Sequence, residues 1–355
     1  MSKRVAIICG GRSSEHEISC ISARGVLSAI DRSQYEPILI GISKSGEWIS
    51  LASDSEFEIG ADGLPTVPLR DGDIKIGTGD LFDRAGRPLK IDLAFPLLHG
   101  AYGEDGTIQG LFEMAGIPYV GSGVLASSVA MDKTFAKPIY ADFGLAVADG
   151  FTIHQRDWAT NPQMEVAKIL ALGFPVFIKP ARSGSSRGTH KVKSEAEIAP
   201  ALADAHKHDP RAMVEVAIKG REIECAVLEV GGIAHASKLS EIRVHEPHEF
   251  YDFEAKYLDG STTFDVPADI SESLTRQIQE AAITAFTALG CEGLARVDFF
   301  LTEDSRVIIN ELNTMPGFTP KSVYPMLWEA SGRNYTELIS QLCLSAITRS
   351  QSVIR

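Results

Sequence analysis

Two apolar runs near the carboxyl end, residues 296–301 and 306–312, flank the polar tetrad 302–305 and predict a β-hairpin. A buried strand rarely carries charge, yet the first run contains Asp298 and the second contains Glu311, with Asn313 just beyond it. This feature constrains the fold most strongly, because the chain must place these polar groups on a sheet and supply partners for them.

The register of this hairpin predicts which side chains meet. If residues 301 and 306 close it, Arg296 faces Glu311 and Asp298 faces Ile309. Since side chains alternate between the two faces of a strand, positions 296, 298, 311 and 313 then share one face. Carboxylates this close need a cation, and Mg²⁺ is commonly held by one or two carboxylates together with substrate phosphates. The alternative is a solvated face on which Arg296 neutralises the acids.

The beginning of the chain predicts an α/β unit with a parallel sheet. Residues 4–9 form an apolar run that ends at two glycines, and residues 35–42 form the next strand. Between them, Ser14 and Glu17 are spaced as a capping box that would open a helix extending to about Ile30. Residues 44–90 are polar and weakly patterned, which indicates an insertion with minor strands, and residues 92–98 return to the sheet.

Further elements follow in the second half. Residues 123–143 are helical, and Pro138 is expected to begin a second helix there. Strands are expected at 176–179, 189–193, 212–216 and 223–230, with a helix over 195–208. A last helix has its apolar positions at core-facing spacing and ends at Gly290, these positions being Leu274, Ile278, Ala282, Phe286 and Leu289.

Bulk properties exclude several classes of protein. A length of 355 residues predicts two or three packed units rather than one core. The net charge of −13 argues against a nucleic-acid partner, which needs a basic surface. No uncharged apolar run approaches the roughly 18 residues of a membrane span, and no secretory signal is evident at the start. Five scattered cysteines without a CxxC pair indicate reduced thiols, so we expect a cytoplasmic protein without a membrane partner.

Three loops carry residues suited to phosphate or ligand binding. KPARSGSSRG at 179–188 offers a lysine, backbone N–H groups and hydroxyls to phosphate, or is an ordinary flexible hairpin. HGAYGEDGTIQG begins with His99 at the end of a strand, where α/β sheets bind ligands, although a single histidine is more often structural. EFYDFEAKYLDG at 249–260 has the aromatic residues and lysine of a lid over phosphate, or is a solvated loop.

Taken in order, these stretches resemble the D-alanine–D-alanine ligases of the ATP-grasp superfamily over nearly the whole chain. The matching motifs are GGRSSEHEIS near the start, HGxxGEDGxxQG, MDK at 131–133, KPxxxGSSxG, GRE at 220–222, YDxExKY at 251–257, RVD at 296–298 and NELNTMPG at 310–317.

The resemblance implies an α/β (α+β ATP-grasp) fold with three domains. Residues 1–121 would form a parallel-sheet α/β domain that binds the first substrate. Residues 122–215 and 216–355 would form two ATP-grasp domains that clamp ATP between sheets, with a lid at about 245–260. It also implies a homodimer that joins two D-alanines at the expense of ATP for peptidoglycan synthesis. Two Mg²⁺ ions are expected, with Mn²⁺ as a substitute and K⁺ as a candidate monovalent cation.

The resemblance also implies roles for single residues. Asp298, Glu311 and Asn313 would hold the metal ions. ATP would be bound by a set drawn from four stretches of chain, namely Lys133, Lys179, Ser185, Ser186, Glu215, Ile218, Glu222 and, from the lid, Lys256. Glu215 would meet the adenine amine, Glu222 the ribose hydroxyls, and the lysines the phosphates.

The substrate side is assigned in the same way. Glu15 would bind the ammonium of the first D-alanine, with His99 near its carboxyl group. Ser322, followed by Val323, would bind the carboxylate of the second D-alanine. Arg296 and the Gly317 N–H would form the oxyanion site.

The lid assignments complete the set that the resemblance implies. Glu15, Ser185 and Tyr257 would be linked by hydrogen bonds that tie the closed lid to the N-terminal domain. A tyrosine at position 257 favours D-alanine as the second substrate, whereas relatives that make the D-lactate ester replace it. Ligases for D-alanine with D-lactate or D-serine are the alternative reading.

Overall fold

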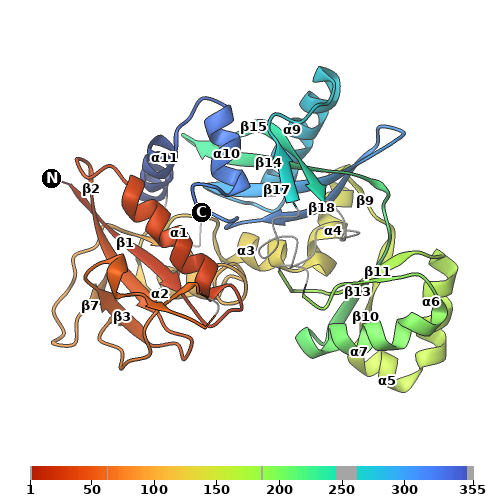
Figure 1. The fold of residues 1–355 in the computed structure, drawn as a ribbon, viewed down its shortest axis with the longest axis horizontal. Helices are drawn as coiled ribbons and strands as arrows, with labels where there is room; N and C mark the ends of the chain where they lie inside the picture. Colours follow the sequence, from red (N-terminus) through yellow and green to blue (C-terminus); the bar gives the residue numbers. More distant parts are fainter. Residues whose placement is uncertain (1, 62, 185–186, 245–261, 350–355) are drawn as a thin grey trace.

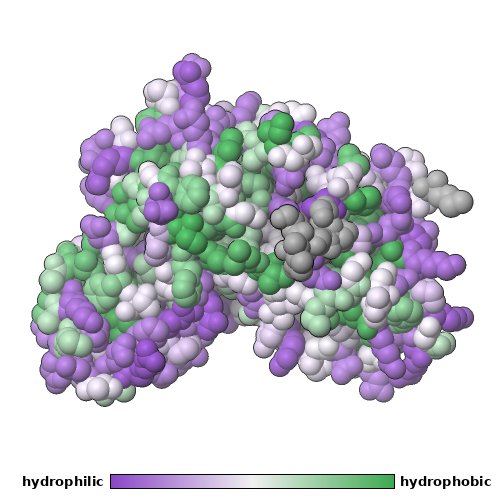
Figure 2. Space-filling view, turned by 180° about the vertical axis from the view of Figure 1, so that it is seen from behind, coloured by the Kyte–Doolittle hydropathy of each residue, from purple (hydrophilic) through white to green (hydrophobic). Residues whose placement is uncertain are grey.

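The computed structural model describes residues 2–61, 63–184, 187–244 and 262–349, and it contains three main sheets (Figure 1). A four-stranded sheet lies in the N-terminal part, a second four-stranded sheet in the middle part, and a six-stranded sheet in the C-terminal part. Figure 2 shows the molecule from behind, with two lower lobes below a common body whose rear surface is apolar at its centre. Among the described residues, no helix combines the length and apolar content needed to cross a bilayer.

The N-terminal sheet confirms the predicted βαβ unit. Its order is β3-β2-β1-β8, with β1 (Lys3–Gly10), β2 (Tyr35–Ile42) and β8 (Leu93–Pro96) parallel and β3 (Trp48–Leu51) antiparallel to β2. β1 and β8 are buried along most of their length, which explains their continuous apolar sequences. The insertion contains, besides β3, the short elements η1 (Asp54–Glu56), β4 (Glu58–Ile59), β5 (Pro65–Thr66), β6 (Lys75–Gly77) and β7 (Asp80–Phe82). The minor strands expected there are confirmed.

The first helix, α1 (His16–Ala29), begins later than predicted, and the capping box is wrong. Glu15 is the N-cap residue and its side chain makes no cap hydrogen bond. The loop before it is fixed differently, because Ser13 Oγ accepts from the Glu15 N–H at 3.2 Å and donates to the His99 carbonyl at 2.7 Å. With the N-cap at 15, Glu17 is at the second helical position and cannot complete the predicted box.

The helical stretch after α2 (Thr107–Ala115) is broken at Asp132 rather than at Pro138, so that prediction is also wrong. Its two helices are α3 (Val124–Met131) and α4 (Lys133–Asp142), and Pro138 lies inside α4. Asp132 is extended, and its side chain accepts from the Thr134 N–H at 3.1 Å, which makes it the N-cap of α4. The proline therefore removes one hydrogen-bond donor from a helix that begins five residues earlier.

The middle sheet is antiparallel and has the order β10-β13-β11-β12. Its strands are β10 (Gly150–His154), β13 (Arg211–Val216), β11 (Val176–Pro180) and β12 (His190–Val192). The helices α5 (Gln155–Thr160), α6 (Pro162–Leu172) and α7 (Ile198–His208, preceded by η2, Glu195–Glu197) lie beside this sheet, and residues of α6 and α7 share its core.

The C-terminal sheet has the order β16-β15-β14-β17-β18-β9. Its strands are β16 (Thr262–Asp265), β15 (Ile233–Val244), β14 (Gly220–Val230), β17 (Leu294–Thr302), β18 (Val307–Asn313) and β9 (Ala146–Val147). Helix α9 (Glu272–Ala288) packs on it as predicted, with Ile278, Ala282 and Phe286 buried and Gly290 just beyond its end. α3 and α4 pack into the same core, whereas α10 (Val323–Ala330) and α11 (Tyr335–Thr348) share a core with the N-terminal sheet.

Candidate active site

Two adjoining cavities lie where the three sheets meet. The larger, about 550 Å³, is lined by β11, β13, β14, β17, β18 and α4. The smaller, about 370 Å³, is lined by α1, the loop after β8 and the segment from β18 to α10. Both cavities share four lining residues, which are Lys133, Ser183, Arg296 and Glu311. A ligand in one cavity would therefore lie next to a ligand in the other.

The hairpin that supplies the acids has a different register from the one predicted. Thr302 and Arg306 close a three-residue turn, in which Ser305 has a positive φ of 64°. A bulge at Asn310, opposite the step from Asp298 to Phe299, then shifts the pairing again, so Asp298 lies opposite Glu311 and Arg296 opposite Asn313. The predicted pairs are wrong, but the two shifts together preserve the alternation. Positions 296, 298, 311 and 313 do share one face.

Arg296 organises the acids on this face. It donates to both oxygens of Asp298 at 2.7 Å and lies 3.0 Å from Oε1 of Glu224, which is buried on β14. Asn313 Nδ2 donates to Asp298 at 3.1 Å. Glu224 was not predicted, although its position opposite Asp298 on the neighbouring strand follows from the sheet register. Arg296 thus neutralises Asp298, as the alternative held, but Glu311 pairs with Lys133 instead and the face is not solvated.

The same residues fit a magnesium site that is completed by phosphate. Asp298 and Glu311 are paired across the hairpin, and Asn313 is hydrogen-bonded to Asp298. The described residues contain no group of three or more His, Cys, Asp and Glu side chains arranged to hold a metal. Two carboxylates and one amide are nevertheless the hard oxygen donors that Mg²⁺ uses when substrate phosphates supply further ligands.

Three lysines of the larger cavity pair with carboxylates. Lys133 Nζ lies 3.1 Å from Glu311 Oε2 and donates to the Ser183 carbonyl at 3.1 Å. Lys179 Nζ lies 2.5 Å from Glu215 Oε2, and Lys137 Nζ contacts Glu215 Oε1. Burial alone would raise the pKa of Glu215, but the ammonium groups of the two lysines lower it to about 2. Lys137 was not predicted, although it lies four residues after Lys133 on α4.

The other residues predicted for ATP are only partly described. Ile218 and Glu222 line the larger cavity together with Lys133, Lys179 and Glu215. Ser185, Ser186, Lys256 and Tyr257 lie outside the described residues, as does the predicted lid at 245–260.

The smaller cavity brings the predicted substrate residues together, namely Glu15, His99, Arg296, Gly317, Ser322 and Val323. A Cβ atom on Gly100 would lie 2.7 Å from Glu15 Oε2, and Gly100 has φ +72°. A glycine is needed there both for its backbone conformation and for the space that the carboxylate occupies. The glycine-rich loop is therefore part of the wall around Glu15.

His99 is held by hydrogen bonds within the protein. Its Nδ1 lies 3.0 Å from the Met315 carbonyl, and its Nε2 lies 3.0 Å from Ser22 Oγ. A carbonyl only accepts, so Nδ1 carries the proton and Nε2 accepts from Ser22. Burial lowers the pKa of His99, in keeping with a neutral ring. The ring thereby joins the loop after β8 to the loop before Gly317.

Glu104 is a further acid of this cavity that the sequence analysis did not single out. The Gly100 N–H donates to its Oε1 at 2.7 Å. Burial, together with the nearby charge of Glu15, raises the pKa of Glu104 to about 8. Its place in the GEDG motif was the available signal.

Ser322 lies at the N-terminal end of α10. Its Oγ is 2.8 Å from Thr319 Oγ1 and accepts from the Thr319 N–H at 3.1 Å. A Cβ atom on Gly317 would lie 3.1 Å from this hydroxyl oxygen. Gly317 and Ser322 therefore lie side by side in the wall of the smaller cavity.

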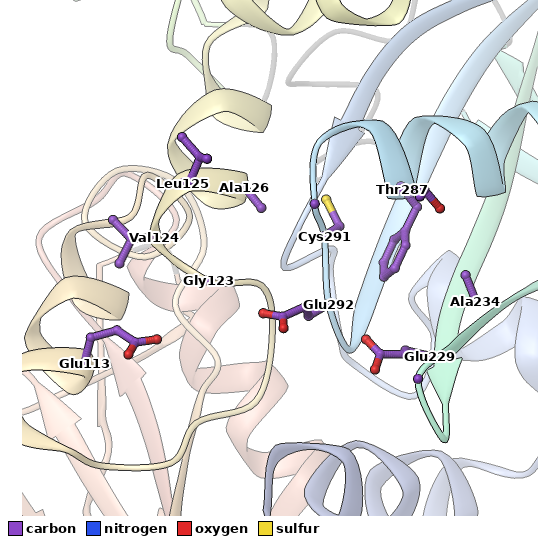
Figure 3. Close-up of a pocket in the computed structure, with 13 residues that line it drawn as sticks. Glu113, Gly123, Val124, Leu125, Ala126, Glu229, Ala234, Thr287, Cys291 and Glu292 are labelled. Carbon is purple, nitrogen blue, oxygen red and sulfur yellow. The ribbon is translucent and has the colours of Figure 1, made fainter. Parts of the chain in front are cut away.

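A third cavity, about 620 Å³, contains none of the predicted site residues (Figure 3). The carboxyl groups of Glu113, Glu229 and Glu292 line it, together with α3 and the end of α9. It contains no lysine or arginine among its lining residues, so it lacks the groups that would balance a triphosphate.

Comparisons with known proteins agree with this geometry. Family models described as "D-ala D-ala ligase N-terminus" and "D-ala D-ala ligase C-terminus" match residues 4–122 and 139–344. A D-alanine–D-alanine ligase of Arthrobacter sp. (strain FB24) is 46% identical over 98% of this chain and 94% of its own, and one of Streptomyces coelicolor is 44% identical over 98% and 93%.

Solved structures give the same result. A D-Ala:D-Ser ligase from Enterococcus faecalis has a TM-score of 0.84 at 35% identity and covers 98% of this chain and 100% of its own. The D-alanine–D-alanine ligase from Coxiella burnetii has a TM-score of 0.82 at 36% identity, with 98% and 94% covered.

Proposed function

The chain belongs to the D-alanine–D-alanine ligase family, and on that basis we propose that it joins two D-alanines into D-alanyl-D-alanine for peptidoglycan synthesis, converting ATP to ADP and phosphate. The observation that carries this proposal is the pair of cavities with shared walls. One has the lysines and acids that suit a triphosphate, and the other has the groups that suit a small amino acid.

The chemistry requires activation of a carboxylate, since oxide is a poor leaving group. A carboxylate oxygen of the first D-alanine attacks the γ-phosphorus of ATP, and ADP leaves. The amine of the second D-alanine then attacks the carbonyl carbon of this acyl phosphate. Phosphate leaves with the bonding electrons and the amine gives up a proton. Phosphoryl transfer of this kind depends on positioning and on neutralisation of charge.

Residues of the larger cavity suit the first step. Lys133 and Lys179 would contact the phosphates, and Glu215 would accept from the adenine amine. Asp298, Glu311 and Asn313 would hold two Mg²⁺ ions, for which Mn²⁺ is a substitute. Bound there, the ions would offset the negative charge of the phosphates. The ion pairs of Lys133 with Glu311 and of Lys179 with Glu215 support this reading, because the site keeps its own charges balanced until nucleotide and metal replace them.

Residues of the smaller cavity suit the second step. Glu15 would bind the ammonium of the first D-alanine, and Ser322 the carboxylate of the second. Arg296 and the Gly317 N–H would stabilise the oxyanion at the carbonyl under attack. Arg296 lines both cavities. This position supports a role at the carbonyl group of the first D-alanine, which is activated in the first step and attacked in the second. His99 would act here by holding the Met315 loop in place.

A coupled assay tests the activity. Phosphate release should require ATP, Mg²⁺ and D-alanine together, and L-alanine in place of D-alanine should give little turnover. Equal turnover with both enantiomers would contradict the proposal.

The acceptor needs its own test, because one similar structure is a D-Ala:D-Ser ligase. D-alanine, D-serine and D-lactate offered in competition at neutral pH should yield mainly D-alanyl-D-alanine. A product made mainly with D-serine or D-lactate would favour the alternative ligases.

The remaining proposals concern organisation. We propose domains at 1–121, 122–215 and 216–355. The first boundary is supported by the family model that ends at residue 122, whereas α3 and α4 share a core with the C-terminal sheet.

We also propose a cytoplasmic homodimer. The use of ATP and five buried, unpaired cysteines support the location. The dimer and any K⁺ requirement rest on the family resemblance. Sedimentation analysis, and assays with and without K⁺, would test them.

A further inference from the structure

Lys137 is a buried lysine of the larger cavity to which the mechanism above gives no role. Its exposed fraction is 3%, and it lines the same cavity as Lys133, Lys179 and Glu215. Burying an ammonium group is costly unless a charged partner compensates for the lost water. The partner that the structure gives Lys137 is Oε1 of Glu215. The role of Lys137 is therefore expected to depend on its contact with the Glu215 carboxylate.

Helix α4 contributes two lysines to the cavity, and they contact different partners. Lys133 and Lys137 are four residues apart, so they lie on one face of the helix, one turn from each other. Lys133 points to Glu311 and the Ser183 carbonyl, at the acid cluster. Lys137 points instead to Glu215 on β13, and the chain beyond β13 continues along the cavity wall through residues 216–218. The two lysines thus pair with different carboxylates of the cavity wall.

Both carboxylate oxygens of Glu215 contact a lysine, and Glu215 also lines the cavity. Its Oε2 pairs with Lys179 and its Oε1 with Lys137. An ionised carboxylate offers about four lone-pair sites, so each oxygen of Glu215 can accept from a ligand as well as from its lysine. A buried, ionised carboxylate that can only accept will favour a ligand that donates at that point, and will disfavour one that presents an oxygen.

We propose that Lys137 is a positioning residue for nucleobase selection, which holds the Glu215 carboxylate so that one of its oxygens accepts from the exocyclic amine of adenine. This inference rests on the proposed function, since it assumes that ATP occupies the larger cavity. Inosine and guanine carry an oxo group where adenine carries the amine, so acceptor would face acceptor. The charges of Lys179 and Lys137 together keep Glu215 ionised, and the contact of Lys137 with Oε1 fixes the position of that oxygen.

The test compares ATP with ITP, which differ at this position of the base. Binding of each nucleotide with Mg²⁺ to the full-length protein is measured by calorimetry without D-alanine. ATP can donate a hydrogen bond to the charged Glu215 carboxylate, whereas the base of ITP offers that carboxylate no donor at this position. We therefore expect the wild type to bind ATP more tightly than ITP by about tenfold to a hundredfold. Lys137→Met should lose most of this preference. If Lys137 instead contacts phosphate, Lys137→Met will weaken the binding of ATP and of ITP by the same factor. The preference for ATP will then remain, which overturns the proposal.

A double-mutant cycle separates this role from a general loss of structure. Glu215→Gln removes the acceptor charge, and Lys137→Met in that background should change the ATP:ITP ratio by less than about twofold. Independent effects of the two substitutions would show that Lys137 does not act through Glu215. Lys168→Met is the matched control, because Lys168 pairs with buried Glu165 on α6 outside the cavity and should leave the ratio unchanged.

Failure of this inference is distinct from failure of the proposed function. A wild-type protein that ligates D-alanine, with an ATP:ITP ratio that Lys137→Met leaves intact, contradicts the inference alone. A wild-type protein that binds no ATP contradicts the proposed function itself. Circular dichroism and the melting temperature of each variant verify that the comparison is made between folded proteins.

Discussion

Glu311 makes two contacts that suit different states of the site. It pairs with Lys133 at 3.1 Å, and it lies opposite Asp298 in the hairpin. Glu311→Gln keeps the shape but removes the charge that a metal ion and a lysine both need. We expect kcat to fall by roughly a hundredfold or more, because bound metal supplies several kcal/mol and each 1.4 kcal/mol is a factor of ten. Steady-state kinetics with varied Mg²⁺ measures this.

Glu303 provides the control for that substitution. It lies in the turn of the same hairpin and pairs at 3.0 Å with Lys219, with both side chains more than four-fifths exposed. Glu303→Gln should leave kcat and the Mg²⁺ dependence unchanged, since exposed pairs contribute little. Wild-type turnover in the Glu311 variant would remove Glu311 from the metal site.

Glu104 should make stability depend on pH. Burial and Glu15 raise its pKa from an ordinary value near 4.5 to about 8 in the folded protein. The folded state therefore binds more protons than the unfolded state between these values, so stability from this group falls as pH rises from about 4.5 to 8. Glu104→Gln cannot ionise. Its melting temperature relative to wild type should rise by a few degrees across this range and level off above it. A difference in melting temperature between Glu104→Gln and wild type that stays constant from pH 5 to 9 would contradict this.

The convergence of residues 296, 298, 311 and 313 on one face was predicted from strand alternation, but it holds because the three-residue turn and the bulge shift the register by one residue each. Glu224 and Lys137 were not predicted. Each reaches the site from an element whose position depends on tertiary packing, β14 beside β17 for Glu224 and α4 against β13 for Lys137. A single sequence shows that such residues are charged, but it does not show whether they line the cavities of the site.

Helix α4 depends on its first turn to aim its lysines. Asp132 caps it through the Thr134 N–H and also pairs with Arg211. Asp132→Asn keeps a good cap and loses the charge, whereas Asp132→Ala loses both. The alanine variant should be less stable than the asparagine variant by about 1 kcal/mol, with a higher KM for ATP. Urea denaturation and nucleotide kinetics measure the two effects, and equal values for both variants would show that the cap does not matter.

The hairpin shows why element details exceed what the sequence predicts. The apolar runs and polar tetrad correctly predicted two strands and a turn. They could not show that Ser305 adopts a left-handed conformation in a three-residue turn, or that Asn310 bulges. Both features depend on small energy differences between turn types, and neither leaves a glycine signature here. In the same way, Pro138 was a plausible helix start, but the stronger cap at Asp132 determined the break.

At the scale of the whole molecule, the two ends of the chain share a core. Tyr35 on β2 donates to the Ser340 carbonyl on α11 at 3.2 Å, and Thr336 donates to the Ala29 carbonyl at 2.8 Å. One apolar cluster includes β1, α1, α10 and α11. The N-terminal sheet is therefore completed by helices some 300 residues away in sequence, which no local pattern predicts.

This shared core predicts one cooperative unfolding unit that includes both ends. Leu342 and Leu344 lie on the same helix, but Leu342 is 1% exposed and Leu344 is 51% exposed. Leu342→Ala should reduce the free energy of unfolding by about 2–5 kcal/mol. It should also lower the temperature of the calorimetric transition in which the N-terminal sheet unfolds. Leu344→Ala should change stability by no more than about 0.5 kcal/mol. If the N-terminal sheet melts independently of the Leu342 substitution, the shared core is not what stabilises it.

We propose that ATP and Mg²⁺ occupy the cavity between the middle and C-terminal sheets, with the metal on the β17–β18 hairpin. A crystal structure with ADP and Mg²⁺ tests it most directly. We expect Mg²⁺ about 2.0–2.1 Å from oxygens of Asp298, Glu311 and Asn313, with Lys133 released from Glu311 to the phosphates. A nucleotide bound elsewhere, or a metal that leaves these three side chains uncoordinated, would contradict it.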